Sequence, residues 1–241
     1  KLAATALAAR TSEGFDNQAS GQYVSRYGVD DYTFALNGNL FDDIGGGGVN
    51  GYGVALITSR VDLSGSPSEA ADAQGPQVAG TSTKIRFNLN RQQHLNDWLS
   101  FYGALASQLS DSNQDSSEKF YLGGPFGVRA YPSDEGGGSN GTLVNLELRG
   151  KLARNLVATA FYDWGQVKVN VNNDFAGAPL LNRYSLEGAG LALAWQHESG
   201  LTLRATWARR IGSNPNATAD GSDQDGTKKL NRFWLSASMP F

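Results

Sequence analysis

Residues 232–241, RFWLSASMPF, alternate between apolar and polar side chains over the end of the chain. Successive side chains of a β-strand point to opposite faces, whereas a helix cannot produce a period of two. The stretch therefore predicts a strand with one apolar face and one mostly polar face. The apolar face holds Phe233, Leu235, Ala237, Met239 and Phe241, and the polar face holds Arg232, Trp234, Ser236 and Ser238.

The same alternation recurs in TSTKIRFNLN, residues 81–90, and in TLVNLELR, residues 142–149. A soluble β-sandwich also alternates, so the periodicity alone leaves that alternative open. Runs of about 8 to 10 residues with aromatic residues near their ends favour a transmembrane barrel. No stretch approaches the roughly 18 apolar residues of a membrane-spanning helix. We therefore expect an all-β fold, a transmembrane antiparallel β-barrel. The aromatic residues near strand ends are Trp98, Tyr162, Trp164, Trp195, Trp207 and Phe241.

Ten strands are predicted, and the segments between them alternate between long and short. Long loops on one rim and tight turns on the other are typical of an outer-membrane barrel, with the tight turns on the periplasmic side. The strands are expected at 2–10, 31–41, 49–63, 80–90, 97–109, 142–150, 155–164, 184–197, 201–211 and 231–241. The long segments are 11–30, 64–79, 110–141, 165–183 and 212–230, and the short ones are 42–48, 91–96, 151–154 and 198–200.

Composition narrows the function classes. The 241 residues are 40% hydrophobic and 18% charged, with 30 Gly and a formal net charge of −3. Scattered Lys and Arg give no electrostatic footprint for nucleic acid, so no nucleic-acid partner is expected. The chain has no Cys, which excludes disulfides and thiolate metal sites. The first ten residues, KLAATALAAR, lack the long apolar core of a signal peptide, and we expect an upstream region to be missing.

The long segment 110–141 places Arg129 among small and aromatic residues. In a barrel this loop is long enough to fold back into the lumen. A cation buried there needs a carboxylate partner, because an unpaired buried charge costs several kcal/mol. Asp163 and Glu147, on strands that follow the loop, are the candidates. The alternative is that Arg129 is an exposed loop residue and Asp163 caps a strand end.

Two motifs carry a family resemblance. GGPFGVRAYP, residues 123–132, resembles the loop motif of the TpsB transporters, the two-partner-secretion branch of the BamA-like superfamily. FYDWG, residues 161–165, resembles the partner motif Phe-x-Asp-x-Gly of that family. FALNGNLFDDIGGGGVNGYGVAL, residues 34–56, also looks like the family's barrel region. The resemblance covers essentially the whole chain, as the C-terminal part of a TpsB barrel.

The resemblance implies a contact inside the barrel. Arg129 of the loop motif would bind Asp163 of the wall motif, with Tyr131 at the loop tip. Gly123, Gly124 and Gly127 would permit the turns of the hairpin. Ala130 stands where many relatives have Gly, so the local backbone is expected to differ. The implied site residues are Gly123, Gly124, Pro125, Gly127, Val128, Arg129, Ala130 and Tyr131 in the loop, and Phe161, Asp163 and Gly165 on the wall.

The resemblance also implies a larger parent protein. TpsB proteins have a plug helix, two periplasmic POTRA domains and a 16-stranded barrel. Residues 1–241 would then be the C-terminal portion of the barrel domain, with the POTRA domains and the N-terminal strands absent. Ten strands could close into a small barrel or form an open sheet with free edges. The implied location is the bacterial outer membrane.

The implied function is export of a large TpsA-like partner protein of the adhesin, haemolysin or contact-inhibition toxin type, without a cofactor. Outer-membrane lipid and the barrel insertion machinery are the other implied partners, and the terminal strand with Phe241 resembles the insertion signal. Two alternatives stay open: a BamA-like barrel assembly factor and a passive pore.

Other candidate sites have weak patterns. Asp220, Asp223 and Asp225 miss the spacing of an EF-hand, so loop 212–230 is expected to be a solvated surface loop. His94 and His197 have no G-x-S-x-G serine, so no enzyme activity is expected, and two His make zinc improbable. Gly45–Gly48 reads as a turn. Lumen-facing charges are expected at Lys84, Arg86, Glu147, Arg149, Glu187, Arg204 and Arg232.

Overall fold

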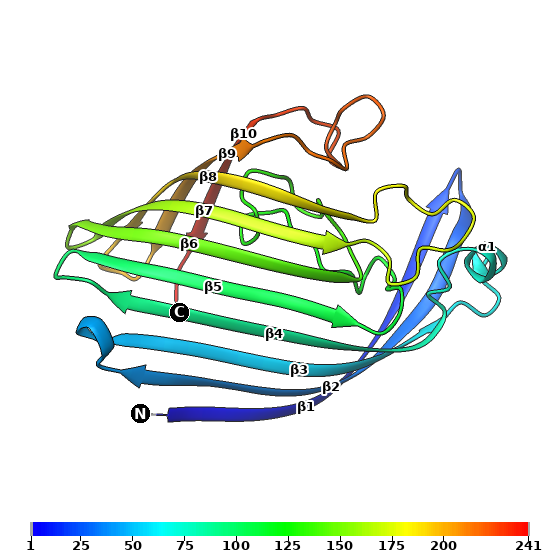
Figure 1. Ribbon diagram of the computed structural model, residues 1–241, viewed down its shortest axis with the longest axis horizontal. Helices are drawn as coiled ribbons and strands as arrows, with labels where there is room; N and C mark the ends of the chain where they lie inside the picture. The colour runs from blue at the N-terminus through cyan, green and yellow to red at the C-terminus, as the bar shows by residue number, and fades with distance from the viewer. Residues whose placement is uncertain (1, 241) are drawn as a thin grey trace.

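The computed structural model describes residues 2–240, and its ten antiparallel strands form one sheet in chain order (Figure 1). Each strand pairs with the next through a hairpin, so the predicted all-β antiparallel fold is confirmed. The strands are β1 (Leu2–Ala19), β2 (Gln22–Asp42), β3 (Gly48–Asp62), β4 (Gly80–His94), β5 (Leu99–Ser110), β6 (Asn140–Ala153), β7 (Leu156–Lys168), β8 (Arg183–Gln196), β9 (Thr202–Ile211) and β10 (Asn231–Ser238).

Helices are few and short. They are the 3₁₀ turn η1 (Ile44–Gly46) and the six-residue helix α1 (Glu69–Gln74). Within residues 2–240, neither has the length and apolar character to cross a membrane. Phe241, the expected insertion-signal residue, lies outside the described residues.

The sheet curves but stays open over the described residues. β1 pairs only with β2 and β10 only with β9, so residues 2–240 leave two sheet edges without a strand partner. The green segment between β5 and β6 folds back over the sheet instead of extending from its end (Figure 1). This segment and strands β6 to β9 enclose the larger buried apolar cluster, which includes Leu122, Val128 and Leu186.

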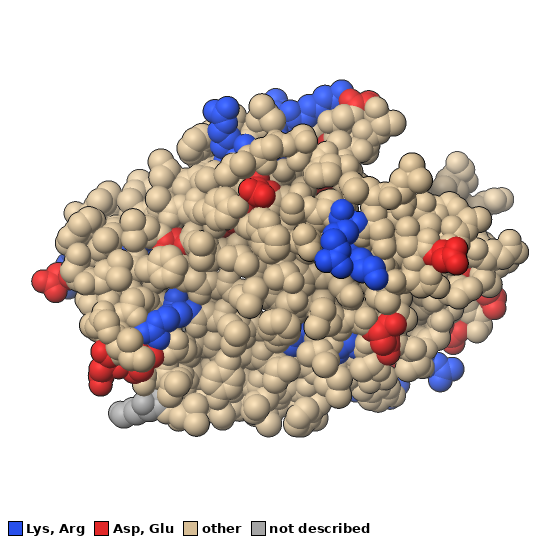
Figure 2. Space-filling model, viewed as in Figure 1, with Lys and Arg blue, Asp and Glu red and all other residues tan. Residues whose placement is uncertain are grey.

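The outer face of the sheet is apolar. Phe233 and Leu235, predicted to share the apolar face of the last strand, are 75% and 85% exposed. Most of the surface turned to the viewer in Figure 2 belongs to uncharged residues. Exposed apolar side chains ordered by strand alternation fit a lipid-facing surface better than a solvated one. Other exposed members include Phe34, Leu56, Ile85, Leu89, Leu148, Leu191 and Leu203.

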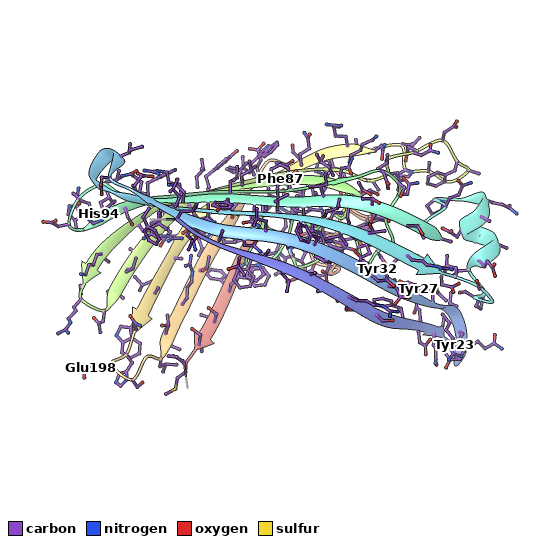
Figure 3. All side chains as sticks on the ribbon, turned by 90° about the horizontal axis from the view of Figure 1, so that it is seen from below. Tyr23, Tyr27, Tyr32, Phe87, His94 and Glu198 are labelled. Atoms are coloured by element: carbon purple, nitrogen blue, oxygen red, sulfur yellow. The ribbon has the colours of Figure 1, made fainter. Side chains whose placement is uncertain are left out.

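The two ends of the sheet carry different connections. Short turns join the strands at 43–47, 95–98, 154–155 and 197–201, and long loops occupy 63–79, 111–139, 169–182 and 212–230. His94 and Glu198, at short turns, lie at one end of the sheet and Tyr23 lies at the other (Figure 3). The predicted alternation of loop lengths is confirmed for these connections.

The prediction of a long loop over residues 11–30 is wrong. β1 and β2 continue through this segment as a hydrogen-bonded hairpin, and Ala19 pairs with Gln22 across a turn at Ser20 and Gly21. Most residues of the segment are polar or glycine, so the alternation that marks a half-buried strand is weak in the sequence. One face of the hairpin packs against a small buried cluster through Phe15, Tyr27 and Val29, and Val61 and Leu63 are the other buried members of that cluster.

Candidate functional site

Loop 111–139 forms a compact hairpin on the inner face of the sheet. The Val128 amide donates to the Leu122 carbonyl at 2.7 Å, and Gly124 takes a φ of 104°. A Cβ at Gly127 would lie 2.0 Å from the Leu122 oxygen, so only glycine allows this approach. Pro125 and Phe126 form the exposed tip, and Phe126 is 91% exposed.

Arg129 binds Asp163, as the resemblance implied. Its Nε donates to Asp163 Oδ2 at 2.9 Å and its Nη2 donates to Oδ1 at 2.7 Å, a bidentate pair. The Arg129 backbone amide also donates to Oδ2 at 3.0 Å. Arg129 is 5% exposed and Asp163 is fully buried. The loop is therefore tied to β7 through both its main chain and its side chain.

Glu147, the second carboxylate considered from the sequence, binds the same guanidinium. Arg129 Nη1 donates to Glu147 Oε1 at 2.6 Å, and Arg149 Nε donates to Glu147 Oε2 at 2.7 Å. Arg204 lies 3.8 Å from Glu147 Oε1. The two carboxylates and the neighbouring arginines form one network across β6, β7 and β9. A network of this kind keeps every buried charge paired.

Two wall residues that the sequence did not single out complete this contact. Asn145 Nδ2 donates to Asp163 Oδ1 at 2.8 Å and to the Gly127 carbonyl at 3.1 Å. Trp234 Nε1 donates to the Arg129 carbonyl at 2.8 Å, which brings β10 to the loop. Phe161, from the wall motif, lies with its ring centroid 3.5 Å from the Arg129 guanidinium carbon, a cation–π contact.

Small residues let the loop approach the wall. A Cβ built at Gly188 on β8 would lie 2.6 Å from the Ala130 Cβ, and one at Gly165 would lie 2.6 Å from a Leu122 methyl. Ala130 is fully buried, and its φ is not positive. Ala130 therefore fits where glycine was expected without the backbone strain of a left-handed conformation. Gly188 carried no signal in the sequence, because glycine is common throughout this chain.

Tyr131 packs against the wall instead of standing at the tip. It is fully buried, and the Arg210 guanidinium carbon lies 4.2 Å from its ring centroid. Burial raises the pKa of the Tyr131 phenol to about 12. The tip position expected for Tyr131 is taken by Pro125 and Phe126.

Lys84 and Arg86 anchor the start of the loop. Lys84 Nζ donates to Ser59 Oγ at 2.9 Å and forms an ion pair with Glu118 of the loop. Arg86 Nε donates to Gln108 at 2.6 Å, and its Nη2 donates to the Glu118 carbonyl at 3.3 Å. Both side chains belong to the inner face, as expected.

The expectation that Glu187 faces the lumen is wrong. Glu187 accepts a hydrogen bond from Tyr162, and it pairs across the sheet with Trp164. These residues alternate with Asp163 and Gly188, so they lie on the outer face. On the outer face, the Glu187 carboxylate is stabilised by its hydrogen bond from the Tyr162 hydroxyl.

The expectation of a solvated loop over 212–230 is also wrong in part. Asp223 is 1% exposed and forms ion pairs with Arg210 and Arg232. Burial alone would raise the pKa of Asp225, but hydrogen bonds from Arg232 and Thr227 lower it to about 2. Within residues 2–240, no group of three His, Asp or Glu side chains is arranged to hold a metal ion.

The hairpin sheet, apolar outer face and docked loop define an outer-membrane β-barrel protein. Residues 57–194 match the haemolysin secretion/activation protein family ShlB/FhaC/HecB, so the chain belongs to this family. This confirms the TpsB resemblance, and members of the family are transporters. The chain is located in the bacterial outer membrane.

The chain is similar to the heme/hemopexin transporter protein HuxB of Haemophilus influenzae, with 26% identity over 66% of this chain and 27% of HuxB. It therefore spans about a quarter of that relative's length. Among solved structures, CdiB from Escherichia coli is similar to this chain, with a TM-score of 0.76 and 15% identity. The match covers 99% of this chain and 42% of the CdiB chain. CdiB from Acinetobacter baumannii is similar with a TM-score of 0.50 and 14% identity, and the match covers 99% of this chain and 47% of that CdiB chain. These two structures support the fold.

Proposed function

We propose that the chain is part of an outer-membrane translocator that exports a large partner protein by two-partner secretion. The observation that carries the proposal is the bidentate contact of Arg129 with fully buried Asp163, which ties a long loop to the inner wall. A passive pore needs no such contact. Family membership supports the same function.

The geometry suggests what each residue does. The polar inner face offers hydrogen-bonding side chains to an extended polypeptide, whereas the apolar outer face meets lipid. Arg129, Asp163 and Glu147 hold the loop beside this path and keep its buried charges paired. Gly165, Gly188 and the small Ala130 permit the close approach. No step of this export requires a cofactor or a covalent reaction, so we propose no enzyme activity.

The proposal extends to the parent protein and its partners. We propose that residues 1–241 are the C-terminal portion of a 16-stranded barrel domain and that missing strands pair with the open edges of β1 and β10. The exported protein is of the TpsA type, with an adhesin, haemolysin or contact-inhibition toxin as its class. The motif residues Gly123–Tyr131 position the loop, and the terminal strand serves the insertion machinery.

Secretion by the full-length protein that contains this chain tests the proposal. The transporter is expressed with its partner, and the partner is measured in the medium and in the periplasm. We expect Arg129→Ala to reduce export at least about tenfold, because it leaves Asp163 buried and unpaired. Arg154→Ala, at an exposed arginine of a short turn, is the matched control and should export normally.

The alternatives predict different results. If export is unchanged in Arg129→Ala at normal membrane levels, the loop contact has no role in transport and the passive pore is favoured. If removing the transporter lowers the membrane content of other barrels and leaves partner export intact, the assembly-factor function is favoured.

A further inference from the structure

A second group of buried charged residues lies between loop 111–139 and loop 212–230. We call it the Glu135–Asp223 cluster, and it combines residues from two loops and two strands. Glu135 belongs to loop 111–139, whereas Asn214 and Asp223 belong to loop 212–230. Its cations come from β9 and β10, whereas the carboxylates that bind Arg129 come from β6 and β7. The members are Glu135, Asn214, Asp223, Arg210 and Arg232.

Glu135 receives hydrogen bonds from loop 212–230 on both of its oxygens. Oε1 accepts from Asn214 Nδ2 at 3.1 Å, and Oε2 accepts from the Gln224 backbone amide at 2.8 Å. The Glu135 side chain is fully buried. A buried carboxylate is costly without donors, so the docked position of Glu135 depends on loop 212–230.

Asn214 joins the two carboxylates of the cluster. Its Nδ2 donates to Glu135 and also to Asp223 Oδ1 at 2.9 Å. Arg232 Nη2 donates to Asp223 Oδ2 at 3.1 Å, and Arg210 contacts the same oxygen. Arg210 also covers the ring of Tyr131, so loop 111–139 enters the cluster through two side chains.

Asp223 forms ion pairs with Arg210 and Arg232, and Asp225 forms a further ion pair with Arg232, whereas Glu135 is held by hydrogen bonds from Asn214 and the Gln224 amide. Removing the Asp223 carboxylate would leave the buried Arg210 without this ion-pair partner. The carboxylates that bind Arg129 lie on β6 and β7, whereas the arginines of this cluster lie on β9 and β10. Besides the Lys84–Glu118 ion pair near its start, loop 111–139 is therefore fixed to the wall both at Arg129 and through this cluster.

We propose that Glu135 and loop 212–230 form a second latch that holds loop 111–139 on the inner wall. Release of the loop then requires both the Arg129–Asp163 contact and the Glu135–Asp223 cluster to open. Loop 212–230 lies at the long-loop end of the sheet, so the outer rim controls the position of a loop that reaches into the lumen. The proposal concerns only the position of loop 111–139. Loop labelling tests it and partner export tests the secretion function, so a failure of one is distinguishable from a failure of the other.

A single reporter cysteine measures loop position. The chain has no native Cys, and Val128, which is fully buried, is replaced by Cys in the full-length protein. A membrane-impermeant maleimide is added to intact cells, and the labelling rate reports how often the loop leaves the wall. Correct insertion is checked by heat-modifiable migration on gels.

In this background we expect Glu135→Gln to raise the labelling rate about tenfold. The carboxamide has one acceptor oxygen, so its NH2 group must face either the Asn214 NH2 or the Gln224 N–H, and one hydrogen bond is lost. The matched control is Asp134→Asn, at the neighbouring exposed carboxylate whose φ of 62° Asn tolerates. Its labelling should equal that of the reporter alone. An unchanged rate in Glu135→Gln, or an equal rise in the control, would overturn the proposal.

Asn214→Ala is a second variant, which changes no charge and no residue of loop 111–139. It removes the donor shared by both carboxylates, so labelling should rise here too, and no rise would contradict the latch.

Combining Glu135→Gln with Arg129→Ala tests whether the two contacts act independently. Two independent latches predict that their fold increases multiply. If Glu135→Gln adds nothing to Arg129→Ala, the cluster secures only loop 212–230 and the proposal is wrong.

Discussion

At the residue scale, Arg129 is held from two strands, by Asp163 on β7 and Glu147 on β6. Burying this cation is tolerable only because both carboxylates and Asn145 complete its surroundings. Breaking a buried ion pair by removing one partner costs more than removing both, since the remaining charge has no counter-charge. The Arg129 contact therefore contributes more to the position of loop 111–139 than to the net free energy of folding.

This asymmetry gives a testable prediction. Asp163→Leu should lower the free energy of unfolding by about 3–5 kcal/mol. The double variant with Arg129→Met should lose less than Asp163→Leu alone, because it also removes the buried guanidinium, which Asp163→Leu leaves with Glu147 as its one bound carboxylate. Urea unfolding followed by tryptophan fluorescence measures both. Losses that simply add would show that the two residues are not coupled in the folded protein.

The sequence predicted this pair because two motifs stand at a recognisable separation, and it offered both carboxylates. It did not predict Trp234 or Gly188, since a strand tryptophan and a strand glycine have no distinctive local pattern. It also did not predict Glu135, whose partners are in a loop 79 and 89 positions away. Such contacts depend on how loops pack together, which no local spacing encodes.

At the element scale, the β1–β2 hairpin shows the limit of strand periodicity. Its outer half, residues 11–30, pairs along the backbone although its side chains alternate only weakly by polarity. The hairpin is supported near its tip end by Tyr27, whose hydroxyl donates to Asp115 of loop 111–139 at 2.8 Å, and by the stacked ring of Phe15. Strands within the membrane were predictable because lipid selects a continuous apolar face, whereas in this hairpin a few separated residues, Phe15, Tyr27 and Val29, pack against a small cluster.

Hydrogen exchange distinguishes a hairpin from a loop over this segment. Paired amides in residues 11–17 and 25–30 should exchange at least about tenfold more slowly than amides at exposed positions of loop 212–230. Mass spectrometry on the protein in detergent or lipid gives the rates. Equal, fast exchange over both segments would show that residues 11–30 form a loop after all.

At the scale of the whole molecule, one sheet separates two environments. The outer face exposes apolar side chains, whereas the inner face carries the charges that dock loop 111–139. The number of strands and the alternation of four long loops with four short turns were predictable, because both follow from local polarity and chain length. The openness of the sheet could not be decided from the sequence, since closure depends on which strands meet at the edges.

Neighbouring positions on β4 test the assignment of the faces. Leu89 lies on the outer face and Asn88 on the inner face, and both are exposed. Leu89→Arg should cost about 2–4 kcal/mol near the membrane centre, because a charge then faces lipid. Asn88→Arg should cost far less. Unfolding in lipid vesicles gives the comparison, and equal losses at the two positions would refute the assignment.

Disulfide trapping tests most directly whether loop 111–139 is docked on the inner wall in the membrane. Arg129→Cys and Asp163→Cys are combined in the full-length protein. The control pair combines Arg129→Cys with Glu198→Cys, which lies in the short turn 197–201. Mild oxidation in membranes should join the first pair efficiently and leave the control pair reduced. If the first pair stays reduced in correctly inserted protein while the introduced loop thiol is freely labelled from outside, the loop is not docked and the proposed transport site is wrong.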